Sequence, residues 1–120
     1  MAIPTGPGTE VLKNIRVENM TNSYSVLING VANHIYTIIS IIFTEIGGAD
    51  ELLYVNTSAA VDTTRSAILN AQSLAAGSTF IWNDKFVLTG TEELHAKTGS
   101  AAAVDVVCSY IDQDLSLIHI

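Results

Sequence analysis

Hydrophobic and polar residues alternate along much of this chain with a period of two. Residues 10–19 place Val11, Lys13, Ile15 and Val17 on one side and the intervening residues on the other. Because successive side chains of a β-strand point to opposite faces of a sheet, this alternation predicts a strand with one buried face.

Similar patterns recur along the rest of the chain, separated by turn residues such as Asn29-Gly30 and Gly47-Gly48. The run 35–46 is the most hydrophobic, and its Ile and Thr residues favour a strand because β-branched side chains lose rotamer freedom in a helix. The further predicted strands are 24–28, 35–46, 51–57, 79–83 continuing through 86–88, 92–98 and 104–111.

The segment 58–72 is open between two interpretations. Its alanines permit a helix on intrinsic propensity. Thr63, Thr64 and the short run 67–69 instead favour a strand that follows a loop, and this is the interpretation we prefer. Together these segments predict an all-β, antiparallel β-sandwich of about eight strands, jelly-roll-like or immunoglobulin-like.

The chain is expected to hold one domain, because 120 residues is a common domain length. Residues 1–9 contain both prolines and predict an extended N-terminal arm, followed by the sandwich domain at 10–114. Residues 115–120 look like the translation of a sequencing adapter, which would make them a non-native tail and indicate a metagenomic source. The alternative is a natural apolar tail that docks on the core.

Composition adds an expectation about partners. Hydrophobic residues make up 48% of the chain, which excludes disorder, while charged residues make up only 14% against roughly 25% in an average soluble domain. Such a surface predicts burial against copies of the same chain, the alternative being a monomer covered by Thr, Ser and Asn. The net charge of −7 and the scattered basic residues argue against direct nucleic-acid binding.

Neither a secretion signal nor a membrane span is expected. The first residues lack the basic and apolar regions of a signal peptide, and the apolar run 35–43 is far shorter than a membrane-spanning helix of roughly 20 residues. The single cysteine, Cys108, lies inside an apolar run and is predicted to be a buried, unreactive thiol, in keeping with synthesis in a reducing cytoplasm.

The titratable residues form no recognisable catalytic or metal-binding pattern. His34, His95 and His119 lack the spacing of zinc ligands, and His95 is predicted on the polar face of its strand beside Glu93 and Lys97. The carboxylate pairs Asp50-Glu51 and Glu92-Glu93 sit at strand starts, where adjacent side chains diverge, so they are interpreted as solvated charges.

No nucleophile elbow, phosphate-binding loop or dinucleotide-binding glycine pattern is present in the sequence. We therefore expect no enzyme activity, no catalytic residue, no metal and no cofactor. Trp82 could stack on a sugar, but Phe80 two positions earlier on the same face favours a place in the core or in a subunit interface.

Several segments together resemble small tailed-phage virion proteins of environmental phages. They are the opening Ala2-Ile3-Pro4-Thr5-Gly6 and the runs 31–41, 73–88 and 102–110, so the resemblance covers nearly the whole chain up to Asp114. It implies a structural role as a capsid decoration or cement protein, or as a neck or tail component, made in the host cytoplasm and located in the virion. It carries over no catalytic residue.

The resemblance and the composition together imply a homo-oligomer, expected as a trimer, that also contacts other virion proteins. The candidate interface residues are Ile3, Pro4, Leu12, Phe80 and Trp82, with the arm lying across a neighbouring subunit's sheet edge. Two alternatives stay open: a receptor- or glycan-binding module with Trp82 or Tyr54 as its platform, and a cellular β-sandwich adaptor.

Overall fold

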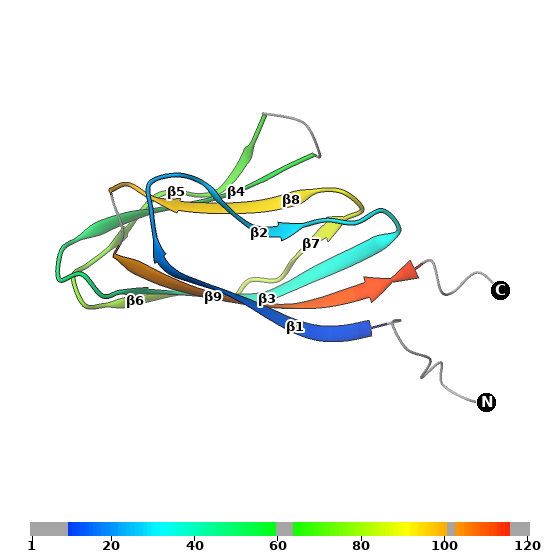
Figure 1. Ribbon diagram of the computed structural model, residues 1–120, viewed down its shortest axis with the longest axis horizontal. Helices are drawn as coiled ribbons and strands as arrows, with labels where there is room; N and C mark the ends of the chain where they lie inside the picture. The colour runs from blue at the N-terminus through cyan, green and yellow to red at the C-terminus, as the bar shows by residue number, and fades with distance from the viewer. Residues whose placement is uncertain (1–9, 60–63, 101–102, 116–120) are drawn as a thin grey trace.

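A computed structural model describes residues 10–59, 64–100 and 103–115, which form a sandwich of two antiparallel sheets (Figure 1). The five-stranded sheet has the order β1-β9-β3-β6, with β7 also paired to β3, and the four-stranded sheet has the order β2-β8-β4-β5. The strands are β1 (Glu10–Met20), β2 (Ser25–Asn29), β3 (His34–Glu45), β4 (Glu51–Ser58), β5 (Ser66–Leu74), β6 (Thr79–Trp82), β7 (Phe86–Thr89), β8 (Glu93–Thr98) and β9 (Val104–Asp114). The predicted all-β sandwich is confirmed.

The structure decides the two uncertain stretches of the sequence. Residues 66–74 form strand β5, so the helix interpretation is wrong for the described part of that segment, and residues 60–63 lie outside it. The predicted strand 79–88 is divided at 83–85 into β6 and β7. Both halves pair with β3, through Ile41 opposite Trp82 and Ile38 opposite Phe86, so the break bends the edge without ending it.

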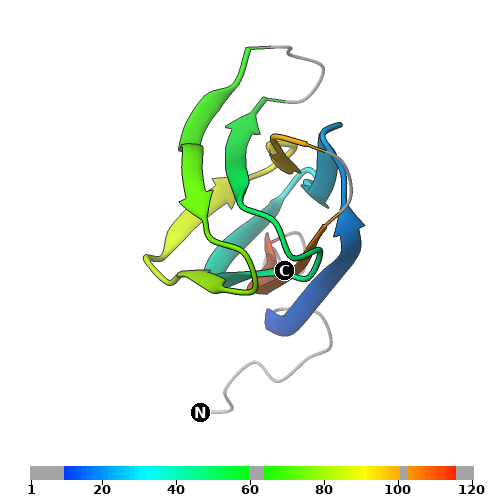
Figure 2. The ribbon, with the colours of Figure 1, turned by 90° about the vertical axis from the view of Figure 1, so that its left-hand side faces the viewer.

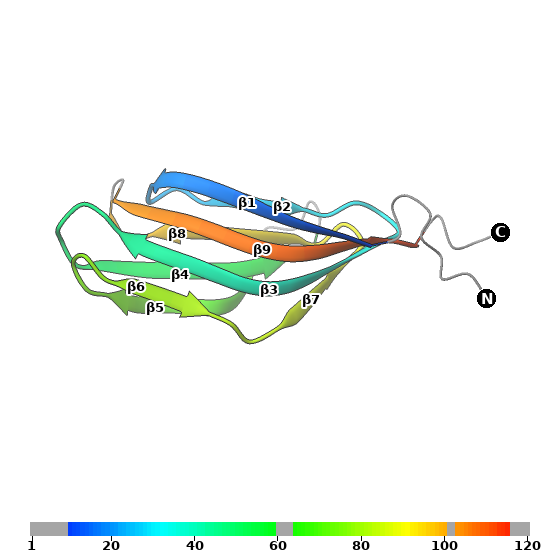
Figure 3. The same cartoon turned by 90° about the horizontal axis from the view of Figure 1, so that it is seen from below.

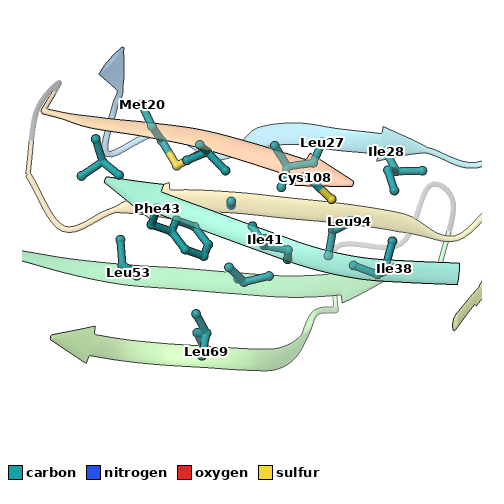
Figure 4. Close-up of a cluster of buried hydrophobic side chains, with 14 of the residues drawn as sticks. Met20, Leu27, Ile28, Ile38, Ile41, Phe43, Leu53, Leu69, Leu94 and Cys108 are labelled. Carbon is teal, nitrogen blue, oxygen red and sulfur yellow. The ribbon is translucent and has the colours of Figure 1, made fainter. Parts of the chain in front are cut away.

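The two sheets pack face to face and enclose the hydrophobic core (Figures 2 and 4). Phe43 and Ile41 of β3 are completely buried, as are Leu53 of β4 and Leu94 of β8 from the opposite sheet. Met20, at the end of β1, is also buried where the chain leaves the five-stranded sheet for β2. The core therefore draws on both sheets, as alternating inward-facing residues of a sandwich predict.

Strand β3 does not keep one regular alternation. Ile38 and Ile41 are both completely buried, although they are three positions apart. In a regular strand, residues three positions apart point to opposite faces. The pairing with β9 shifts between Ile38 and Ser40, which marks a β-bulge. Ile39 and Ser40 consequently face away from the core, and this places Ile42 on the outer face as well.

A buried carboxylate organises the turns at one end of the sandwich. Glu45, the last residue of β3, accepts hydrogen bonds from the backbone N–H groups of Gly77 (2.8 Å), Gly47 (2.7 Å) and Gly48 (2.9 Å). These bonds hold the pKa of Glu45 below its ordinary value, and the bond from Gly77 has the largest effect. Together they outweigh burial, which would raise the pKa. Glu45, a charged residue inside the predicted apolar strand, thus stabilises the turn at Gly47 and Gly48 and the turn at Gly77.

At the other end of the sandwich the described chain starts and finishes side by side. Glu10 of β1 is paired with Gln113 of β9, and the Leu115 N–H donates to the Asn33 carbonyl at 2.8 Å. The predicted arm, with Ile3 and Pro4, and residues 116–120 of the predicted tail lie outside the described residues. Within the described residues, no helix has the length and hydropathy to cross a membrane.

Candidate functional site

Strands β1, β9 and β3 of the five-stranded sheet lie side by side (Figure 3). The outer face of this sheet carries an uncharged surface across its middle strands. The pairing registers place Leu12 of β1 beside Ile111 of β9, which lies opposite Thr37 of β3. We call this surface the uncharged face. Its members are Leu12, Thr37, Ile39, Ser40, Ile42, Ile81, Val87, Val107, Ser109 and Ile111.

The apolar members of the uncharged face are accessible to varying degrees. Leu12 is 72% exposed, Ile81 55% and Val87 52%, while Ile42 and Val107, which lie opposite each other, are half-buried. The charged residues that share this side, among them Arg16 and Asp105, lie on the outermost strand or at the end of β9. An apolar centre with polar residues around it is the arrangement of a protein–protein contact surface.

The predicted interface residues do not all lie on this face. Leu12 does, whereas Phe80 and Trp82 pair with the inward-facing Phe43 and Ile41 and are half-buried against the core. The Phe80 ring lies 6.2 Å from that of Phe43. Phe80 and Trp82 thus share one face of β6, as predicted, and that face is directed between the sheets.

Trp82 lines an open cleft between the edges of the two sheets rather than standing free on a surface. Its indole N–H donates to the Asp84 carbonyl at 2.7 Å, and its ring meets that of Phe86 edge-on at 6.3 Å. The cleft has a volume of about 420 Å³, and Ile68 of β5 lines it from the other sheet. The indole is therefore held by its own neighbours, which weakens its interpretation as a sugar-stacking platform.

His95 lies on the predicted polar face of its strand, but it is buried there. It does share the outer face of β8 with Glu93 and Lys97, but β8 lies between β2 and β4 and the residue is only 6% exposed. The Tyr24 ring packs on it edge-on at 6.1 Å, and its Nε2 lies 3.1 Å from a Glu93 oxygen. Burial is the main cause that lowers the pKa of His95, and the positive charge of nearby Arg65 lowers it further.

A second polar cluster lies at the end of the five-stranded sheet where β1 begins and β9 ends. Asp112 receives hydrogen bonds from Lys13 Nζ at 2.9 Å and from His34 Nδ1 at 2.6 Å. The His34 ring stacks on Tyr36 at 5.8 Å, and Tyr36 Oη accepts the Val31 N–H at 2.9 Å. The cluster closes this end of the core with satisfied polar groups, and sequence spacing alone did not reveal it.

Three of the four paired carboxylates are less exposed than predicted, whereas Asp50 is exposed as predicted. Glu51 is 6% exposed and accepts the Ser100 hydroxyl at 2.6 Å, so its interpretation as a solvated charge is wrong. Glu92 accepts the Thr89 N–H at 2.7 Å and fastens the turn between β7 and β8. Among the described residues no group of three His, Cys, Asp or Glu side chains could hold a metal ion.

Cys108 is completely buried between the sheets, as the sequence predicts. Burial raises the pKa of its thiol to about 12. Since the thiolate is the reactive form, the native protein is expected to resist an aromatic disulfide reagent at about pH 8. A colour change is expected only after unfolding in guanidinium. Rapid reaction of the folded chain would contradict the buried position.

Comparisons with known proteins establish the fold. No protein-family model and no curated protein matches the chain. A solved structure from Bacillus, described as endospore appendages forming disulfide-linked pili, is 17% identical with a TM-score of 0.55, and the match covers 96% of both chains.

Viral capsid proteins are also among the structural neighbours. The T13 particle of IBDV matches with 12% identity and a TM-score of 0.54 over 97% of this chain, which spans 36% of the viral chain. A pentameric capsid protein isolated from metagenomic phage sequences matches with 14% identity and a TM-score of 0.47, over 88% of this chain and 63% of that one. At these identities the likeness concerns the sandwich fold, which this chain shares with proteins of virus particles and pili.

Proposed function

We propose that this chain is a structural subunit of a phage virion that assembles with copies of itself through the uncharged face. The observation that supports this is a row of apolar side chains, Val107, Ile42 and Ile81, that lie side by side across β9, β3 and β6. The charged Arg16 and Asp105 lie only at the edges of that side of the sheet. Burying its isoleucines and valines would release water from apolar surface that a monomer leaves exposed.

A second copy of the chain is a suitable partner for this face. An uncharged apolar surface can be buried against neighbouring copies around a three-fold axis without repulsion between like charges. The low charged fraction of 14% agrees with subunits that hide part of their surface in an assembly. We propose a closed trimer in the particle, either decorating the capsid or joining neck and tail parts, with no catalytic role.

Oligomeric mass measured by light scattering tests this proposal. The wild-type chain is expected at three times its 12.8 kDa, and the Ile42→Lys variant at the mass of one chain. Ile42 lies in the middle of the uncharged face opposite Val107, so an unpaired ammonium group there costs several kcal/mol on burial in the contact.

The matched control is Val26→Lys on β2, which adds the same charge to an exposed position of the other sheet. This variant is expected to keep the wild-type mass, and circular dichroism shows whether both variants retain their strands. A wild-type monomer, or an Ile42→Lys variant that keeps the wild-type mass, would overturn the proposed contact. A cryo-EM map of the native particle locates the subunit directly.

A further inference from the structure

Two cations gather on aromatic rings at the outer face of the four-stranded sheet. The Arg65 guanidinium lies 4.4 Å from the centre of the Tyr24 ring, and Lys97 Nζ lies 4.9 Å from the centres of both Tyr24 and Tyr54. No described carboxylate forms an ion pair with either cation. In a chain of net charge −7, this pair of cations makes a local positive site.

The layer beneath these rings holds them in place. Tyr24 Oη accepts a hydrogen bond from Asn56 Nδ2 at 2.9 Å, and Tyr24 packs on His95, which lies 3.1 Å from Ser58 Oγ. Asn56 is 6% exposed, and its Oδ1 has no hydrogen-bond partner among the described residues. These contacts from below fix the Tyr24 ring over which the two cations lie.

A groove of about 550 Å³ begins beside Tyr54, the second tyrosine that Lys97 contacts. Tyr54 contacts Lys97 and also lines the groove, so the cation site and the groove are continuous. The other lining residues come from β4, β5 and the turns at that end of the sandwich, namely Asp50, Glu51, Leu52, Ser73, Leu74, Ala75, Gly99 and Ser100. The groove thus combines an apolar floor with hydroxyl and carboxylate groups, a lining suited to small polar ligands.

We propose that this surface binds an oligosaccharide with one acidic sugar at its end. The carboxylate of that sugar lies between Arg65 and Lys97, where charge-assisted hydrogen bonds from the two side chains favour it. The neutral sugars lie in the groove, and their hydroxyls donate to the exposed carboxylate of Asp50.

The two groove carboxylates exclude competing ligand classes. Nucleic acid or a polymer with a charge on every unit would bring anions against Asp50 and Glu51, and repulsion would oppose it. A neutral oligosaccharide would leave the two cations unused. The distribution of charge therefore selects a ligand that is anionic at one end only. This inference does not depend on the proposed assembly, because the site lies on the opposite sheet from the uncharged face.

Calorimetric titration with sialyllactose and with lactose tests the site, because the two probes differ only by the carboxylated sugar. Sialyllactose is expected to bind at least about tenfold more tightly than lactose. The double variant Arg65→Gln, Lys97→Gln is expected to bind the two sugars equally weakly. Ser73→Trp, an exposed position that lines the groove, is expected to abolish binding by filling the space.

The matched control is Arg16→Gln, Lys85→Gln, which removes two positive charges elsewhere and is expected to bind sialyllactose like the wild type. Lack of sialyllactose binding, or equal binding of lactose by the wild type, would overturn the proposal. So would an equal loss in the control, or tighter binding of an acidic peptide such as hexaglutamate. Oligomeric mass is measured on the same variants and is expected to stay at the wild-type value, which separates failure of this site from failure of the proposed assembly.

Discussion

Replacing Phe43 with alanine is expected to lower the free energy of unfolding by about 3–5 kcal/mol. Phe43 is completely buried in the centre of the core (Figure 4). Its ring lies 6.2 Å from that of Phe80 on the neighbouring strand. The smaller side chain loses this apolar contact and leaves a cavity between the two sheets, which close packing on both sides prevents from collapsing. Chemical denaturation at one fixed protein concentration measures the loss.

The control for this variant is Val26→Ala on β2, 48% exposed on the outer side of the other sheet. Its effect on the stability of the isolated chain is expected to stay within about 0.5 kcal/mol. A loss for Phe43→Ala no larger than that of the control would show that the two sheets do not pack as described.

Asp112→Asn is expected to cost about 1–3 kcal/mol at neutral pH. Burial by itself would raise the pKa of Asp112, but the hydrogen bonds from Lys13 and His34 outweigh it and hold the pKa below its ordinary value of 3.8. The asparagine retains the shape but loses the negative charge that both donors require. It also replaces one of the two acceptor oxygens with an N–H₂ group, which then faces either the His34 donor at 2.6 Å or the Lys13 donor at 2.9 Å.

The pH dependence of this loss follows from the direction of the shift. Because the folded-state pKa is lowered, the contribution of Asp112 is complete above the ordinary value of 3.8 and disappears as the pH falls through the folded-state pKa. The wild type and the variant should therefore become equally stable in strong acid. The other titratable groups at this cluster are Lys13, His34, Tyr36, Tyr110 and Asp114, and both proteins contain them.

The exposed Asp84→Asn substitution gives the matched control, since it makes the same change in charge outside the cluster. It is expected to leave stability unchanged at neutral pH. A stability difference between wild type and Asp112→Asn that stays constant into strong acid would contradict the lowered pKa.

Much of the strand pattern could be predicted because local alternation records which side of a strand is buried. Leu94 and Ala96 were expected to face inward, and both are completely buried. The apolar run that forms β3 hid its own bulge, because Ile occurs on both faces and a change of side at Ile39 leaves no trace in the pattern. The outward-facing residues of β3 contribute the middle of the uncharged face.

The burial of His95 could not be predicted, because it depends on which strands are neighbours. A polar alternation on β8 indicates an exposed side only if no other residue covers that side. Here Tyr24, from the β1–β2 connection, covers His95. Arg65 and Lys97 likewise meet at one ring only because the strand order brings their elements together. Sequence spacing reports neighbours along one strand, whereas both outer-face sites are built across strands.

The position of β9 between β1 and β3 has a consequence for how the protein folds. The contact between Lys13 and Asp112 joins residues 99 positions apart, so the larger sheet forms through contacts of high sequence separation. Such topologies fold slowly, in roughly milliseconds to seconds. During synthesis β1 and β3 must wait for the last strand to leave the ribosome, and until then both present unpaired backbone edges. Chains interrupted before β9 are therefore the forms most exposed to aggregation.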